Sequence, residues 1–166
     1  AGKRKNIQIL IVEPDDLNRR NLRHLLQREG YRTFCTVKGE AALEELKQHH
    51  YHILFSNLHV ADMEGIQLMQ QAKRFRPDLE VIFVTDQASV ESAVRSMMAG
   101  AFSYMPRPFS IKHLFSLVDQ ALEKTMIRRK IRVRHHEIRQ KRGIQFIGQS
   151  PSIVQLKSDI AEIAQL

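Results

Sequence analysis

The first 122 residues of this 166-residue chain predict an α/β fold with a doubly wound, five-stranded parallel sheet. Two observations lead to this prediction. Short β-branched or apolar runs alternate five times with longer stretches of helical period, which favours strand–helix–strand crossovers. The first and third runs are apolar almost throughout, as parallel strands buried on both faces are. Right-handed crossovers would then place helices on both faces of the sheet.

Each strand prediction depends on a run of β-branched, aromatic or aliphatic residues between turn-forming segments. The predicted strands are Ile7–Val12, Tyr31–Cys35, Ile53–Ser56, Val81–Thr85 and Phe102–Tyr104.

The predicted helices between and after these strands are Leu17–Arg28, Gly39–Gln48, Gly65–Phe75, Ser89–Met98 and Ser110–Leu122. Gly30 follows the first helix and Gly100 follows the fourth, at positions where a helix end favours glycine. Pro77 closes the third, since proline cannot continue a helix.

The last of these helices is expected to continue through a basic segment, because its apolar pattern does not stop at Leu122. Ile127, Ile131, Arg134 and Ile138 follow one another at intervals of 4, 3 and 4 residues, a heptad-like spacing with one arginine in the seam. We therefore expect a helix from Ser110 to about Arg142, ended by Gly143. Residues 123–143 would form a basic linker and a possible dimeric coiled coil.

Residues 144–166 predict the beginning of a second domain. A strand-like piece (Ile144–Ile147) and a turn precede an amphipathic helix (Ile153–Ala164) that has too little around it to form a core of its own. The expected organisation is therefore a domain at 1–122, a linker at 123–143 and the start of a truncated domain at 144–166.

The overall composition, 43% hydrophobic and 27% charged, is that of an ordinary soluble globular protein. No apolar run approaches the roughly 18 to 20 residues of a membrane span. Cys35 is the only cysteine, which excludes an intrachain disulfide framework and a zinc site built on paired cysteines. A reducing, cytoplasmic location is expected.

The net charge of +8 is unevenly distributed. Residues 1–122 carry +2, residues 123–142 carry +7, and residues 143–166 carry −1. Only the linker therefore raises the question of an acidic partner such as nucleic acid. It lacks interleaved aromatic residues, so a solvated face around a dimer seam is the favoured interpretation, and nucleic-acid binding is kept as an alternative.

Polar side chains follow the carboxyl ends of the predicted strands, where doubly wound sheets carry their sites. They are Glu13, Pro14, Asp15 and Asp16 after the first strand, Asn57 after the third, Thr85 at the end of the fourth, and Tyr104 and Arg107 at and after the fifth. The acids predict either a residual cation site or a helix cap by Asp15 or Asp16, and the cap is favoured.

Residues 7 to about 122 resemble a response-regulator receiver domain of the NtrC type. The resemblance is carried by the segments from Asn57 to Gly65 and from Gly100 to Phe109, which look like the phosphoacceptor segment and the active-site lysine segment of that family. It implies a flavodoxin-like receiver fold. It also implies that Thr85 provides the hydroxyl group that contacts the phosphoryl group in this family. Tyr104 would stand at the aromatic switch position. For Tyr104, simple packing remains an equal alternative.

Three positions depart from the family pattern. Asn57 replaces the aspartate nucleophile. A carboxamide is a poor nucleophile, and it has no negative charge with which to bind Mg²⁺. Pro14 replaces one of two metal-binding acids. Arg107 replaces the lysine and keeps its charge but not its geometry. We therefore expect a pseudo-receiver with no catalytic residue, no cofactor and no Mg²⁺ site.

Two alternatives stay open. Asn57 could be an engineered substitution of aspartate in a receiver that is otherwise competent for phosphorylation. Alternatively, the chain could be a nucleotide- or nucleic-acid-binding module that uses the basic helix and the Arg107 pocket.

The segment Phe146–Leu156 resembles the opening of a σ54-activating AAA+ ATPase domain. No Walker A loop is present, so the chain is not expected to hydrolyse ATP. The resemblance implies the regulatory module of a bacterial σ54-dependent activator that forms a homodimer and controls the downstream AAA+ domain. A regulatory protein or a small ligand could set the assembly. Contacts with DNA and RNA polymerase are expected only in the full-length protein.

Overall fold

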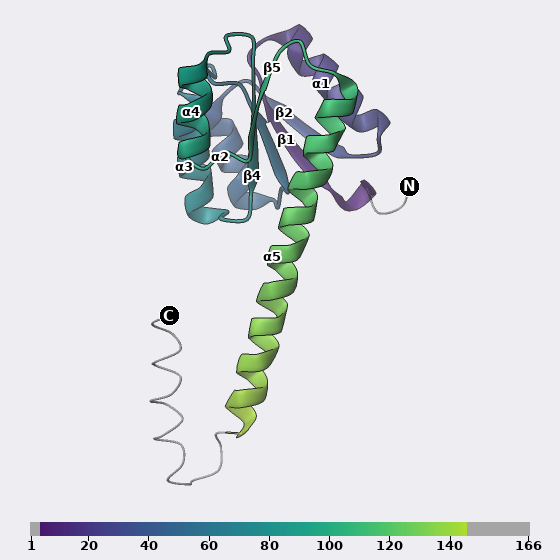
Figure 1. Cartoon of the computed structure of the whole chain (residues 1–166), viewed down its shortest axis with the longest axis vertical. Helices are drawn as coiled ribbons and strands as arrows, with labels where there is room; N and C mark the ends of the chain where they lie inside the picture. Colours follow the sequence, from purple (N-terminus) through teal and green to yellow (C-terminus); the bar gives the residue numbers. More distant parts are fainter. Residues whose placement is uncertain (1–3, 146–166) are drawn as a thin grey trace. The chain divides into compact units, whose positions relative to one another are not determined.

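The computed structural model describes residues 4–145, with side chains up to Lys141. Its strands form one parallel sheet (Figure 1). The strand order is β2-β1-β3-β4-β5. The strands are β1 (Gln8–Val12), β2 (Arg32–Thr36), β3 (Ile53–Ser56), β4 (Glu80–Thr85) and β5 (Ser103–Pro106), and a 3-10 turn, η1 (Arg4–Asn6), precedes them. The predicted five-stranded parallel sheet is confirmed.

Five helices accompany the strands in the described part of the chain. They are α1 (Asp16–Arg28), α2 (Gly39–Gln48), α3 (Gly65–Phe75), α4 (Val90–Met98) and α5 (Ile111–Gln145). The predicted bounds of α2, α3 and β3 are confirmed, and the starts of the other elements differ by one residue. Strand β5 ends at Pro106, two residues beyond its predicted end at Tyr104.

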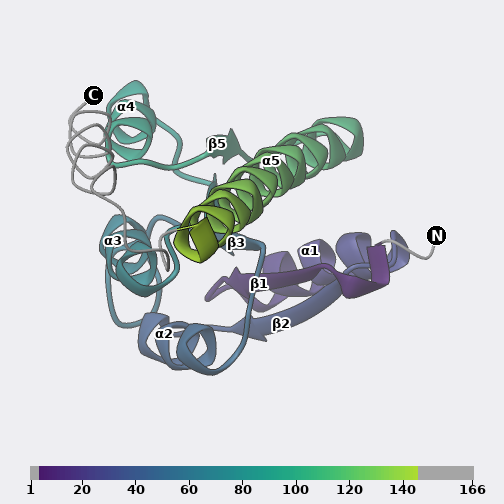
Figure 2. The ribbon, with the colours of Figure 1, turned by 90° about the horizontal axis from the view of Figure 1, so that it is seen from below.

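Two apolar cores lie on opposite faces of the sheet, because successive side chains of a strand point to opposite sides. In β1, Ile9 and Ile11 pack into the core beneath α1 and α5, whereas Leu10 and Val12 pack into the core beneath α2 and α3. Figure 2 shows the sheet between these two layers, with α4 beside β5. All residues of β3 and β4 are buried, as central parallel strands should be.

Two helix ends have the glycine conformation that the sequence predicts. Gly30 has a φ of 90° and Gly100 a φ of 106°, both in the left-handed region that suits a residue without a Cβ. The amide of Tyr31 donates to Leu26 and that of Ala101 to Ser96, which closes the last turns of α1 and α4.

The predicted end of the long helix at Gly143 is wrong. Helix α5 passes through Gly143 to Gln145, so the first two residues of the predicted strand Ile144–Ile147 are helical. A single glycine costs a helix only about 1 kcal/mol relative to alanine, which does not stop it when no proline follows. The rest of that strand, the AAA+-like segment and the helix Ile153–Ala164 lie outside the described residues.

The chain divides into two units between Met126 and Ile127, within α5. The first unit contains the sheet, and Thr125 is still buried in it. The limits of the three predicted domains stay predictions.

Among the helices of residues 4–145, none combines the length and the apolar character that a bilayer crossing requires.

Candidate functional site

The strand order brings the ends of β1 and β3 together at the centre of the carboxyl edge of the sheet. The backbone amide of Asn57 donates to the carbonyl of Val12 at 3.0 Å. This pairing places the Asn57 side chain beside Glu13, the first residue after β1. Two predicted site residues that are 44 positions apart thus become neighbours.

Glu13 is the centre of the site, and it is 2% exposed. Its Oε1 accepts a hydrogen bond from the backbone amide of Asp15 at 3.0 Å. Asn57 Nδ2 lies 3.2 Å from both carboxylate oxygens. Arg107 Nη2 donates to Oε2 at 2.9 Å. The buried carboxylate therefore has hydrogen-bond partners on both oxygens and a cation at contact distance, which a buried charge needs.

Arg107 comes from the loop after β5 and is also nearly buried, with an 11% exposed side chain. Its amide donates to the carbonyl of Thr85, which fixes the loop against the end of β4. Its Nη1 forms a second ion pair with Asp86, at 3.3 Å from Oδ2. One guanidinium therefore bridges two carboxylates, a use that its planar fork of donors permits.

Asp15 and Asp16 stabilise the start of α1. Asp15 Oδ1 accepts from the amide of Asn18 at 2.8 Å, so the favoured helix cap is confirmed. Asp16 forms ion pairs with Arg19 and Arg20 at 2.6 and 2.9 Å. Neither carboxylate joins Glu13 as a partner of Asn57.

Thr85 and Tyr104 are engaged separately from Glu13. Thr85 is buried, and its Oγ1 accepts from the amide of Gln87 at 3.1 Å. The Tyr104 hydroxyl lies 2.7 Å from Ser92 Oγ and accepts from the amide of Ser89 at 3.4 Å. Ser89 and Ser92 form the capping box of α4, so Tyr104 attaches β5 to the first turn of that helix.

The side-chain oxygens of Glu13 and Asn57 already accept hydrogen bonds within the chain. A divalent ion would need several open oxygen ligands. Pro14 has no side-chain oxygen, and the Glu13 oxygens already accept hydrogen bonds from Asp15, Asn57 and Arg107. Asn57 directs its Nδ2, a donor, at the carboxylate, while its Oδ1 accepts weakly from the amide of His59 at 3.4 Å. Within residues 4–145, no group of three or more His, Cys, Asp or Glu side chains is arranged to hold a metal.

The loop after β3 is held by Gly65 and Asp62. A Cβ on Gly65 would lie 2.3 Å from the carbonyl oxygen of Asn57, so the close approach of α3 to the site requires glycine. Asp62 accepts from the amides of Gly39 and Glu40 at 2.6 and 3.0 Å. Burial raises the pKa of Asp62, but its backbone hydrogen bonds and the charge of Lys38 together lower it by more, so the net pKa is below its ordinary value.

Sequence reasoning missed Asp86 and Asn18. Asp86 Oδ2 accepts from both Arg107 and Asn18 Nδ2, the latter at 3.1 Å. Asp86 directly follows β4, so the rule that sites collect at strand ends would have identified it. Asn18 belongs to a helix face, and no periodic signal distinguishes it.

An open groove of about 440 Å³ adjoins Arg107. Its walls include Asn18 and Leu25 from α1, Asp86, and Phe109 from the loop before α5. It offers a small ligand carboxamides, a carboxylate and an apolar wall beside the Glu13 network.

A family model described as the response regulator receiver domain matches residues 9–119 of the chain. The chain is 28% identical to the regulatory protein AtoC of Escherichia coli K12 over 158 residues, which are 95% of this chain and 34% of AtoC. It is also 28% identical to the DNA-binding transcriptional regulator NtrC of Escherichia coli K12 over 146 residues, 88% of this chain and 29% of NtrC.

Among solved structures, a CheY-like receiver domain protein from Methanospirillum hungatei superposes with a TM-score of 0.69 at 27% identity. The match covers 74% of this chain and 98% of that one. Of the two curated relatives named above, AtoC and NtrC, the chain spans only about a third of the length.

Proposed function

The chain belongs to the response regulator receiver domain family, and we propose that it is the regulatory receiver module of a bacterial σ54-dependent transcription activator that works without aspartyl phosphorylation. The module has no catalytic residue in this proposal. It controls dimerisation, and through it the assembly of an AAA+ ATPase domain that follows in the full-length protein.

The observation that carries the proposal is the internally neutralised site of Glu13, Asn57 and Arg107. Arg107 supplies a positive charge at 2.9 Å from the buried carboxylate of Glu13. Asn57 completes the network as a hydrogen-bond donor. A carboxylate that already accepts hydrogen bonds from Arg107 and Asn57 has little capacity left for the metal that accompanies a phosphoryl group.

The same network argues against an engineered substitution at Asn57. Its carboxamide and the Arg107 guanidinium, two departures from the family pattern, converge on one carboxylate. The third departure, Pro14, lies next to that carboxylate. Three departures at one site are more economically explained by a natural loss of phosphorylation than by one designed change.

Dimerisation through α5 is supported by an apolar seam. Ile127, Ile131 and Ile138 are each about half exposed, at 51%, 51% and 49%. Large aliphatic side chains at heptad-like spacing gain free energy when a second helix covers them. Base-specific DNA contacts and RNA polymerase contacts would belong to other parts of the full-length protein. A regulatory protein or a ligand in the groove beside Arg107 would set the assembly.

The phosphoryl site is tested with Mg²⁺ and beryllofluoride, a phosphoryl mimic. We expect no change in the amide NMR spectrum around Asn57 and no change in sedimentation, because the site offers neither a nucleophile nor metal ligands. A receiver domain with an intact acceptor aspartate serves as the positive control. Site-specific shifts together with a changed oligomeric state would overturn the proposal.

The dimer seam is tested by salt and by substitution. We expect the dimer to strengthen as salt rises, because like charges on the two α5 helices then repel each other less. Ile131→Asp should abolish the dimer in sedimentation equilibrium. Val133→Asp is the matched control, since Val133 is also 51% exposed but lies on the opposite side of the helix. A dimer that weakens with salt, or an equal loss in both variants, would argue against the seam.

A further inference from the structure

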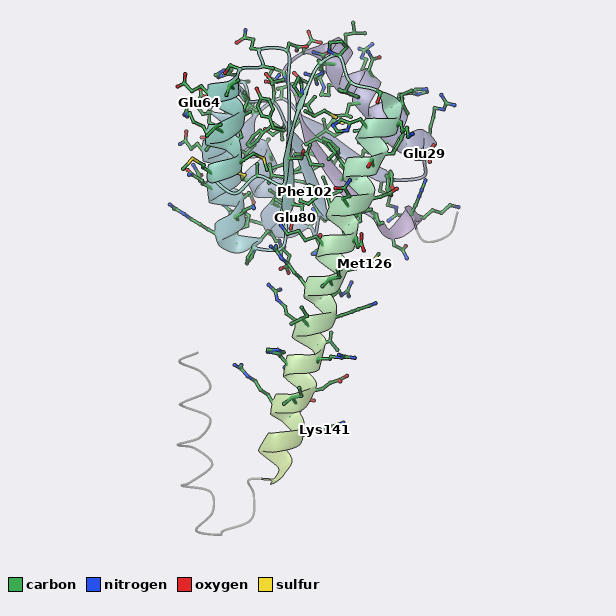
Figure 3. All side chains as sticks on the ribbon, in the orientation of Figure 1. Glu29, Glu64, Glu80, Phe102, Met126 and Lys141 are labelled. Atoms are coloured by element: carbon green, nitrogen blue, oxygen red, sulfur yellow. The ribbon has the colours of Figure 1, made fainter. Side chains whose placement is uncertain are left out.

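The described part of α5 beyond Ile127 is strongly basic. Between positions 128 and 141 the helix carries seven Arg and Lys residues against a single acid, Glu137. All of these side chains are exposed except that of Arg128, which is half-buried. Figure 3 shows long side chains standing away from the ribbon between the labelled Met126 and Lys141. The receiver function proposed above does not use these charges.

Helical spacing gathers four basic side chains on one face of α5. At about 100° per residue, positions i, i+4, i+7 and i+11 fall within a sector roughly 60° wide and about 16 Å long. We call this set the basic stripe; its members are Arg128, Arg132, His135 and Arg139. The apolar seam occupies the neighbouring sector of the helix. Lys130, Glu137 and Lys141 lie beyond the seam, on the side of the helix opposite the basic stripe. The stripe therefore stays accessible when the seam is paired.

We infer that the basic stripe binds the phosphate backbone of double-stranded DNA. Three of its members are arginines, whose guanidinium groups bind phosphate oxygens through two parallel hydrogen bonds. No acid lies on this face. A single helix fits the width of the major groove, and a row of cations along it can neutralise successive phosphates without reading bases. Arg128 and Arg132 also take part in interactions within the chain, with which phosphates would compete.

DNA fits this surface better than an anionic membrane does. A helix that lies in a membrane interface needs a broad apolar face opposite its charges, usually with aromatic residues. Residues 127–141 contain no aromatic ring of Phe, Tyr or Trp, and Arg134 interrupts the isoleucine seam. The basic residues also surround most of the helix. The surface is thus complementary to a polyanion in water.

The test uses the 166-residue chain and labelled duplexes of about 20 base pairs in two unrelated sequences, with affinity followed by fluorescence anisotropy as salt rises. The stripe variant is Arg132→Gln with Arg139→Gln. The matched control is Lys130→Gln with Lys141→Gln, which removes the same charge from the opposite face. Glutamine keeps the helix propensity of the residues that it replaces, and circular dichroism verifies this.

We expect similar affinity for both duplexes and a salt slope that falls by about 2 in the stripe variant, with affinity lower on the order of ten-fold. The control variant should lose much less affinity for DNA. Equal losses in both variants, or no binding by the unaltered chain, would overturn the inference. Binding to phosphatidylserine vesicles or to polyglutamate in preference to DNA would also overturn it, and would assign the stripe to a membrane or to an acidic protein. None of these outcomes depends on the phosphoryl site.

Discussion

Replacing Arg107 with methionine should lower the free energy of unfolding by about 3 to 5 kcal/mol, because a buried carboxylate then loses its cation. The side chains of Glu13 and Arg107 are 3% and 11% exposed, so water can replace little of the lost interaction. Methionine keeps most of the side-chain volume. Urea denaturation of the variant and the unaltered chain measures the difference.

Two further variants make this result specific to the buried pair. Arg20→Met removes the ion pair between Arg20 and Asp16, whose side chains are 76% and 58% exposed. This change should lower the free energy of unfolding by less than about 1 kcal/mol. Adding Glu13→Gln to Arg107→Met should recover a large part of the loss, since a neutral amide tolerates burial better than an unpaired charge. A loss at Arg107 no greater than that at Arg20, or no recovery in the double variant, would contradict the neutralised site.

Placing a carboxylate at position 57 with Asn57→Asp should destabilise the protein by about 3 kcal/mol at neutral pH. The change replaces two hydrogen bonds to Glu13 with the repulsion of a second carboxylate about 3 Å away. Asn57→Ala is the matched control, because it removes the same hydrogen bonds without adding charge. The difference in unfolding free energy between the two variants isolates the repulsion.

The pH dependence of Asn57→Asp has a definite sign. Repulsion between the two carboxylates raises the folded-state pKa of one of them above its unfolded value. The variant is therefore closest to the unaltered protein in stability at low pH, and it loses stability as pH rises from the unfolded pKa through the folded pKa. Thermal unfolding at pH values between the unfolded and the folded pKa measures this loss of stability. A variant that is as stable as Asn57→Ala at all pH values, or that accepts phosphate from acetyl phosphate, would show that the site tolerates a second acid.

The fold and the residue types of the site could be predicted from the sequence because both are local properties. Side-chain periodicity distinguishes strands from helices, and it placed α2, α3 and β3 at their observed bounds. Asn57 and Pro14 stand where the resemblance to receiver domains leads us to expect acids, and both are visible without coordinates. The helix cap by Asp15 likewise depends on a residue only three positions away.

The function of these residues within the site was decided by the tertiary structure. Glu13 and Arg107 are 94 positions apart, and only the pairing of β1 with β3, β3 with β4 and β4 with β5 brings them to 2.9 Å. The partners of Asp86 were decided in the same way, since they come from α1 and from the loop after β5. Sequence periodicity records which face of an element is buried, but charge compensation depends on distance in space, and that distance is set only when the sheet has assembled.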